Sequence, residues 1–155
     1  MRAVGIILAG GNSNKMRELT HKRAVAAMPI AGSYRAIDFA LSNMSNSHIQ
    51  KVAVLTQYNA RSLNEHLNSS KWWDFGRKQG GLYVFTPTIT AENGYWYRGT
   101  ADAIYQNLDF LKRCHEPYVI ITSGDAVYKM DYNKVLEYHI CLLYTSDAAD
   151  DMQCV

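Results

Sequence analysis

The sequence predicts an α/β domain built on a mainly parallel sheet, from its composition, its short apolar runs and the helical segments between them. Its 155 residues are 48% hydrophobic and 19% charged, with 10 Gly and 3 Pro. This length suits one domain with its own core, and the composition excludes disordered, collagen-like and coiled-coil chains. Strands that alternate with helices are typical of βαβ units.

Four short apolar runs are the predicted strands. In chain order they are residues 3–8, 52–55, 82–85 and 118–121. Three of them are continuously apolar rather than alternating, which indicates burial on both faces of a parallel sheet. We therefore expect residues 3–8, 52–55 and 119–121 to be central strands.

Apolar residues at helical spacing occupy the intervals between these strands. The expected helices cover residues 34–44, 59–67, 100–113 and 133–140. The third has the clearest pattern, because Ala101, Ile104, Leu108 and Leu111 form one stripe. No repeat or linker interrupts residues 1–140, so we expect a single domain there.

Charge and cysteine content limit the kinds of binding partner and the cellular compartment that we expect. Sixteen Lys and Arg against fourteen Asp and Glu give a net charge of +2, without a basic block suited to nucleic acid. No apolar run approaches the length that spans a membrane. Three cysteines form no disulfide framework, and an odd number suits reduced thiols. We expect a cytoplasmic protein that binds neither nucleic acid nor membrane.

Gly10 and Gly11 directly follow the first strand. Glycines there let the backbone turn sharply and bring N–H groups against phosphate oxygens. Donors and positive charge follow at Asn12, Ser13 and Lys15. The pattern is neither a Walker P-loop nor a dinucleotide fingerprint. It fits a phosphate site, and an ordinary strand-to-loop turn fits it too.

Two later segments carry further polar groups. Asp125 follows the strand at 118–121, and ligands of parallel sheets bind at the carboxyl ends of strands. A carboxylate there can hold Mg²⁺, or it can serve a turn or a helix cap. We expect Asp125 at the mouth of the same cleft as Gly10 and Gly11. Residues 96–103 combine small and aromatic side chains, which suits either a base or sugar site or an aromatic packing cluster.

In this order, the segments resemble glucose-1-phosphate adenylyltransferase (ADP-glucose pyrophosphorylase). The matching segments are residues 8–11, 19–24, 35–43, 56–58, 96–103, 123–125 and 128–132. The resemblance covers residues 1 to about 140. It implies a Rossmann-like nucleotidyltransferase domain that takes part in making ADP-glucose for glycogen from ATP and glucose 1-phosphate with Mg²⁺.

The same resemblance implies roles for individual residues. Lys15 and Asp125 would be catalytic, Asp125 would also bind Mg²⁺, and Tyr97 would bind glucose 1-phosphate. Gln57 and Trp96 would link the nucleotide site to regulation. The nucleotide-binding residues would be Leu8, Ala9, Gly10, Gly11, Gln57, Gly99 and Thr100.

Two departures from the family pattern bear on activity. Catalytic members carry Gly-Gly-x-Gly-Thr-Arg-Leu, whereas here Lys15 stands in place of the arginine. In the pattern Arg-Ala-Lys-Pro-Ala, Val25 replaces a phosphate-contacting lysine. These changes resemble the regulatory (GlgD-type) subunit, which partners a catalytic chain and has little activity of its own. A catalytically competent enzyme, or a nucleotide-binding Rossmann domain of another class, are the alternatives.

Residues 141–155 do not continue the family resemblance. They resemble translated sequencing-adapter read-through, so we expect a non-native tail after an N-terminal fragment. The family continues into the rest of the sugar-phosphate half and a left-handed β-helix, and the fold expected here is truncated before both.

Overall fold

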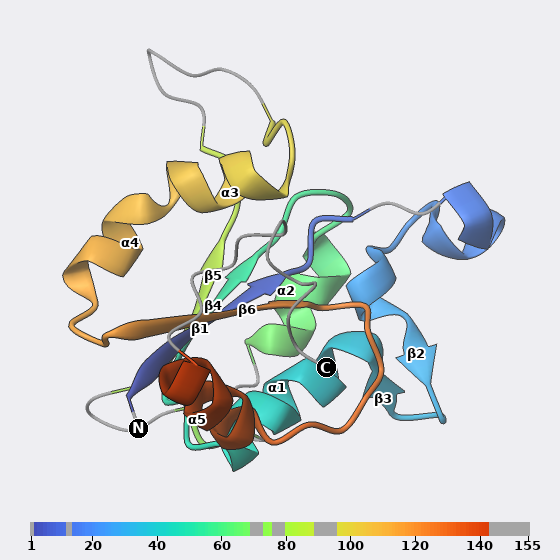
Figure 1. Ribbon diagram of the computed structural model, residues 1–155. Helices are drawn as coiled ribbons and strands as arrows, with labels where there is room; N and C mark the ends of the chain where they lie inside the picture. Colours follow the sequence, from blue (N-terminus) through green and yellow to red (C-terminus); the bar gives the residue numbers. More distant parts are fainter. Residues whose placement is uncertain (1, 12–13, 69–72, 76–79, 89–95, 143–155) are drawn as a thin grey trace, which may run out of the picture.

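A four-stranded, fully parallel sheet forms the centre of the protein. The computed structural model describes residues 2–11, 14–68, 73–75, 80–88 and 96–142. The strands are β1 (Ala3–Leu8), β4 (Lys51–Leu55), β5 (Gly81–Phe85) and β6 (Tyr118–Ser123), in the order β5-β4-β1-β6. Helices cover both faces of this sheet (Figure 1). The predicted α/β class with a mainly parallel sheet is therefore confirmed.

The two faces of the sheet carry separate apolar clusters. On one face, α1 (Ala36–Asn46), α2 (Arg61–Leu67) and α5 (Tyr132–Leu142) pack over the larger cluster, which includes the fully buried Ile7. On the other face, α3 (Thr100–Gln106) and α4 (Leu108–Arg113) cover a smaller cluster that includes Ile6. Neighbouring β1 side chains thus enter different cores, as the two-residue period of a strand requires.

Short elements connect β1 to α1. They are the 3₁₀ helices η1 (Asn14–Thr20) and η2 (Val25–Ala27) and the antiparallel pair β2 (Pro29–Ile30) and β3 (Tyr34–Arg35). Because β3 uses Tyr34 and Arg35, α1 begins at Ala36 rather than at residue 34. The Asp38 carboxylate accepts the Arg35 backbone N–H at 2.9 Å and caps this end of the helix.

The helix expected over residues 100–113 is two helices. The break lies at Asn107, whose φ of −108° and ψ of 17° depart from helical values. Its side-chain amide donates to the Ala103 carbonyl at 2.8 Å and to the Tyr97 hydroxyl at 3.0 Å. Ala101, placed on the predicted apolar stripe, is exposed. An asparagine side chain can compete for backbone hydrogen bonds, as Asn107 does here, and so interrupt a helix. The spacing of apolar residues does not reveal such a break.

The prediction that residues 119–121 form a central strand is wrong. Within the described residues β6 lies at the edge of the sheet, beside β1 alone. Val119 and Ile121 are 44% and 51% exposed. They share a face with Ile6, since Ile6 pairs with Ile121, but α3 and α4 cover the β1–β4–β5 side of that face. By contrast, β1 and β4 are interior strands, as predicted.

The remaining helices follow the sequence closely. Helix α2 begins at Arg61 because Asn59 has a φ of 45°, outside the right-handed helical range. Helix α5 extends to Leu142, and residues 143–155 lie outside the described residues. The boundary proposed at residue 140 stays a prediction. None of the helices in the described part of the chain has the length and apolar character needed to cross a membrane.

Candidate functional site

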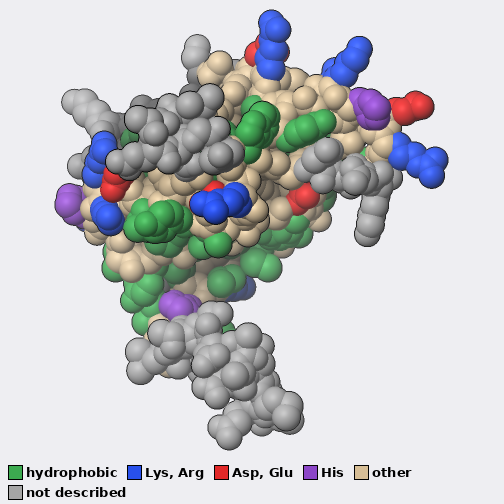
Figure 2. Space-filling view, turned by 90° about the horizontal axis from the view of Figure 1, so that it is seen from above, with side chains coloured by type: hydrophobic (Ala, Val, Ile, Leu, Met, Phe, Trp, Pro, Cys, Tyr) green, Lys and Arg blue, Asp and Glu red, His purple; other side chains and the backbone are tan. Residues whose placement is uncertain are grey.

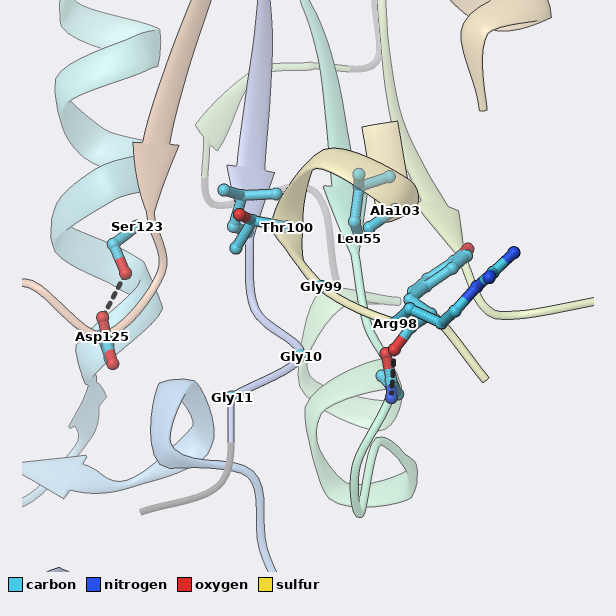
Figure 3. A pocket seen from close by; sticks show the side chains of 12 residues that line it. Gly10, Gly11, Leu55, Arg98, Gly99, Thr100, Ala103, Ser123 and Asp125 are labelled. Atoms are coloured by element: carbon cyan, nitrogen blue, oxygen red, sulfur yellow. Dashed lines mark hydrogen bonds between the residues drawn. The ribbon is translucent and has the colours of Figure 1, made fainter. Parts of the chain in front are cut away.

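A cavity of about 550 Å³ opens at the carboxyl ends of β1, β4 and β6 (Figure 3). This edge is where parallel sheets bind ligands. Its lining residues come from the ends of three strands and from the start of α3: Leu8, Gly10, Gly11, Leu55, Gln57, Tyr97, Arg98, Gly99, Thr100, Ala103, Ser123 and Asp125. Eight of the eleven predicted site residues are thereby brought together from distant parts of the chain.

The glycine pair after β1 forms the middle of the cavity wall. A Cβ on Gly10 would lie 3.1 Å from Cβ of Gln57, tighter than ordinary van der Waals contact. A Cβ on Gly11 would meet nothing within 4 Å, so this position faces open space. Gly10 therefore permits close packing against the end of β4, while Gly11 leaves backbone accessible to a ligand.

Asp125 lies on the β6 side of the cavity. The Ser123 hydroxyl donates a hydrogen bond to its carboxylate, and both side chains are exposed. Gly124 between them donates its N–H to the Leu8 carbonyl at 2.9 Å, which ties the turn to the end of β1. Asp125, Gly10 and Gly11 thus line one cavity, as the sequence predicts; the roles assigned to them stay predictions.

Residues Arg98 to Ala103 form the opposite wall. Gly99 and Thr100 line it as expected, and Arg98 lies across the cavity from Asp125 (Figure 3). The Arg98 backbone N–H donates to the Asp102 carboxylate at 2.9 Å, which fixes the turn into α3. Sequence reasoning did not select Arg98. Its positive charge inside the small and aromatic segment was the signal that could have found it.

Tyr97 lines the cavity from a buried position. It is 8% exposed and packs with Ile6 and Leu55, while its hydroxyl accepts a hydrogen bond from Asn107. Its backbone carbonyl accepts from the Gln57 amide at 3.3 Å. The tyrosine therefore links the end of β4 to the α3–α4 break, and its hydroxyl already has a partner within the protein.

Three other predicted residues are not among the lining residues. The Ala9 N–H donates to the Leu55 carbonyl at 2.8 Å, and Ala9 is buried. Trp96 is 60% exposed. The Lys15 backbone belongs to η1, but its side chain lies outside the described residues.

The described residues contain no group of three or more His, Cys, Asp or Glu arranged to hold a metal. Asp125 is the carboxylate among the lining residues. On the face shown in Figure 2, Lys and Arg side chains stand at several separate places rather than in one patch.

A parallel sheet with its cavity at the carboxyl edge, beside a glycine turn, defines a Rossmann-like α/β domain. Residues 4–144 match the family described as Nucleotidyl transferase. The chain belongs to this nucleotidyl transferase family.

Within this family, the chain is similar to curated proteins of one named activity. The chain is 48% identical over 136 residues to glucose-1-phosphate adenylyltransferase of Thermosipho africanus (strain TCF52B), which is 88% of this chain and 33% of that protein. It is 50% identical over 136 residues to glucose-1-phosphate adenylyltransferase of Clostridium perfringens (strain SM101 / Type A), covering 35% of that protein. The chain thus spans about a third of the length of these relatives.

Proposed function

We propose that the full-length protein is a regulatory subunit of glucose-1-phosphate adenylyltransferase. It would assemble with a catalytic subunit in the cytoplasm and support ADP-glucose synthesis from ATP and glucose 1-phosphate, with little activity of its own. Two observations support these substrates. The relatives carry that enzyme name, and the chain has a cavity at the carboxyl edge of its sheet. Membership of the nucleotidyl transferase family removes the alternative of a Rossmann domain of another class.

The cavity suits a nucleotide. Its volume falls within the range of about 300–1,000 Å³ typical of small-molecule sites. Leu8, Leu55 and Ala103 offer apolar surface for a planar base, and the glycine turn offers backbone N–H groups for phosphates. Gln57, held at Tyr97, would add an amide beside them.

Mg²⁺ fits the Asp125 side of this cavity. Mg²⁺ is commonly held by one or two carboxylates, with substrate phosphates and water completing its shell. Asp125 is an exposed carboxylate on the cavity wall, and its hydrogen bond from Ser123 orients one of its oxygens. Bound there, Mg²⁺ would neutralise phosphate charge, while Asp125 would hold it and Gly10 and Gly11 would leave room for the phosphates.

The regulatory assignment depends on one observation, the loss of charge at Val25. Val25 begins η2, is half-buried, and is followed by the buried Ala26 and Ala27. An aliphatic side chain packed there cannot contact phosphate. At Lys15, lysine keeps the charge of the family's arginine but not its planar two-pronged donor. Losing such contacts lowers the rate by on the order of a hundredfold or more.

The test uses the full-length protein, purified alone and together with the catalytic-type subunit of its own organism. Alone, it should make ADP-glucose at least about a hundredfold more slowly than that subunit. Together, the two should form a stable hetero-oligomer whose activity differs from that of the catalytic chain alone. A rate matching the catalytic subunit would instead support the catalytically competent alternative. A protein that shows no activity of its own and does not assemble with the catalytic subunit would overturn both the regulatory proposal and the catalytically competent alternative.

A further inference from the structure

Helix α1 holds the segment that follows β6. Residues 124–131 form no helix or strand, and in Figure 1 this segment runs past α1 on its way to α5. The Asn43 amide donates to the Tyr128 carbonyl at 3.0 Å, and the Asn43 side-chain oxygen accepts the Met130 N–H at 3.2 Å. One side chain thus pairs with two backbone groups more than 80 residues away.

These bonds form in a buried setting. Asn43 is 4% exposed, so its amide is well shielded from water. Ser47, one helical turn later and 3% exposed, accepts the Tyr132 N–H at 2.9 Å. A buried polar group left without a partner costs about 1–3 kcal/mol, so these pairings strongly favour one conformation of the segment.

A cluster of three hydroxyl groups holds the same segment to β6. The Tyr128 hydroxyl lies 2.5 Å from the Thr122 hydroxyl and 2.8 Å from the Tyr132 hydroxyl. Burial raises the pKa of Tyr132 to about 12, so its phenol stays protonated and available as a hydrogen-bond donor. Tyr128 is therefore held through both its backbone and its side chain.

Asp125 lies between the two attachment points of the segment. On one side, the Gly124 N–H is bound to the Leu8 carbonyl. On the other, three residues later, the Tyr128 carbonyl is bound to Asn43. The exposed Asp125 side chain therefore takes its place on the cavity wall from the bonds on either side of it.

We propose that Asn43 is a positioning residue for Asp125: its two hydrogen bonds hold the 124–131 segment so that the carboxylate faces the cavity. The inference rests on the proposed function, in which Asp125 binds a divalent cation beside the nucleotide. Asn43 acts through the backbone of Tyr128 and Met130 and is not among the residues that line the cavity.

The experiment measures binding of Mn²⁺ with ATP to the full-length protein, by electron paramagnetic resonance of Mn²⁺. Asn43→Ala should weaken binding about tenfold, the lower end of the usual cost of losing a group that orients a metal ligand. Asp125→Asn should weaken it at least as much. Adding Asn43→Ala to Asp125→Asn should cause little further loss, because the two changes remove one effect. Fully additive losses would overturn the proposal.

Ser45→Ala is the matched control. The Ser45 hydroxyl donates to the Trp73 carbonyl at 2.8 Å, so this variant removes a bond from the same helix to a different segment. It should bind Mn²⁺ with ATP as the parent does. If thermal melting shows that Asn43→Ala does not fold, Asn43→Asp takes its place, since this side chain of the same shape still accepts from the Met130 N–H but, as a carboxylate, does not donate to the Tyr128 carbonyl.

Hydrogen exchange of the amides of residues 125–131 separates this inference from the proposed function. Asn43→Ala should speed their exchange well beyond the effect of Ser45→Ala, whether or not the parent binds nucleotide. If the parent binds no Mn²⁺ with ATP, the cation and nucleotide site proposed at Asp125 fails, and exchange alone decides whether Asn43 positions the segment. Equal exchange in the two variants would overturn the inference.

Discussion

Gly124 lies where the end of β6 meets the end of β1. A Cβ at this position would lie 3.1 Å from Cγ2 of Ile7, 3.2 Å from Cβ of Ala9 and 3.3 Å from the Leu8 carbonyl oxygen. Two of these neighbours are buried core residues with little room to move. The absent side chain therefore allows the Asp125 turn to pack directly on the strand that carries the glycine pair.

From this packing, Gly124→Ala should lower the free energy of unfolding by about 1–3 kcal/mol, the usual cost of an inserted methyl group in a filled core. Gly11→Ala is the control, since a Cβ there meets nothing within 4 Å, and its stability should change by less than about 0.5 kcal/mol. Urea unfolding of the full-length variants measures both. Equal stabilities for the two variants would contradict the packing argument.

The positions at 15 and 25 can be tested together. In the full-length protein, Lys15→Arg with Val25→Lys should raise ADP-glucose synthesis more than either change alone, because both groups would act on one substrate. Val25 is half-buried, so a lysine there can extend its charge toward solvent along its apolar stem.

Steady-state assays of the two single variants and the double variant measure this effect, with thermal melts to confirm folding. If the double variant folds but is as inactive as the parent, the low rate of ADP-glucose synthesis has another cause. Ser13, Ala26 or the part of the protein beyond this chain would then account for it.

At the scale of elements, an ion pair joins the start of β4 to the segment before β6. Lys51 Nζ lies 2.9 Å from Oε1 of Glu116, and their side chains are 25% and 16% exposed. The hydrogen bond to Glu116 raises the pKa of Lys51. Burial alone would raise the pKa of Glu116, but the hydrogen bond and charge of Lys51 lower it overall.

A lowered carboxyl pKa gives stability that is present above the unfolded-state value of about 4.3 and is lost as the pH falls below it. Glu116→Gln should therefore cost roughly 1 kcal/mol at pH 7, and this difference from the parent should shrink toward zero near pH 3. Urea unfolding across this pH range measures it.

Asp109→Asn provides the comparison for the ion pair. Asp109 lies 3.7 Å from Lys112, and both side chains are more than 60% exposed. Its loss should change stability little at any pH. A cost for Glu116→Gln that stays constant from pH 7 to pH 3 would show that packing, rather than charge, accounts for the pair.

At the scale of the whole molecule, the β6 edge is an exposed apolar strand. Val119 and Ile121 project from a strand whose outer side has no neighbour among the described strands. Such edges pair with other chains. The 155-residue chain should therefore self-associate, and Ile121→Lys should increase its monomeric fraction.

Size-exclusion chromatography over a range of concentrations measures this association. Tyr105→Lys is the control, because Tyr105 is 73% exposed but lies on α3, away from any sheet edge. If both variants increase the monomer equally, general surface hydrophobicity, and not the β6 edge, drives the association.

Much of the fold was predictable because its signals are local. The continuous apolar runs of β1 and β4, and the helical spacing before and after them, are properties of a few neighbouring residues. The glycine pair and Asp125 could be expected at one cavity because parallel strands end at a common edge. Those expectations needed only the order of the elements along the chain.

What the sequence by itself determined is the four strands of the main sheet, their parallel arrangement and the polar groups at their carboxyl ends, but not the antiparallel pair β2 and β3. Only the tertiary structure decided which strand lies at the edge, where Val119 and Ile121 remain exposed although their sequence resembles that of β1. It also decided that Arg98 lines the cavity and that Asn43 holds the segment carrying Asp125. The physical reason is that burial and side-chain pairing depend on which distant elements come into contact. A local pattern of residues does not determine those contacts.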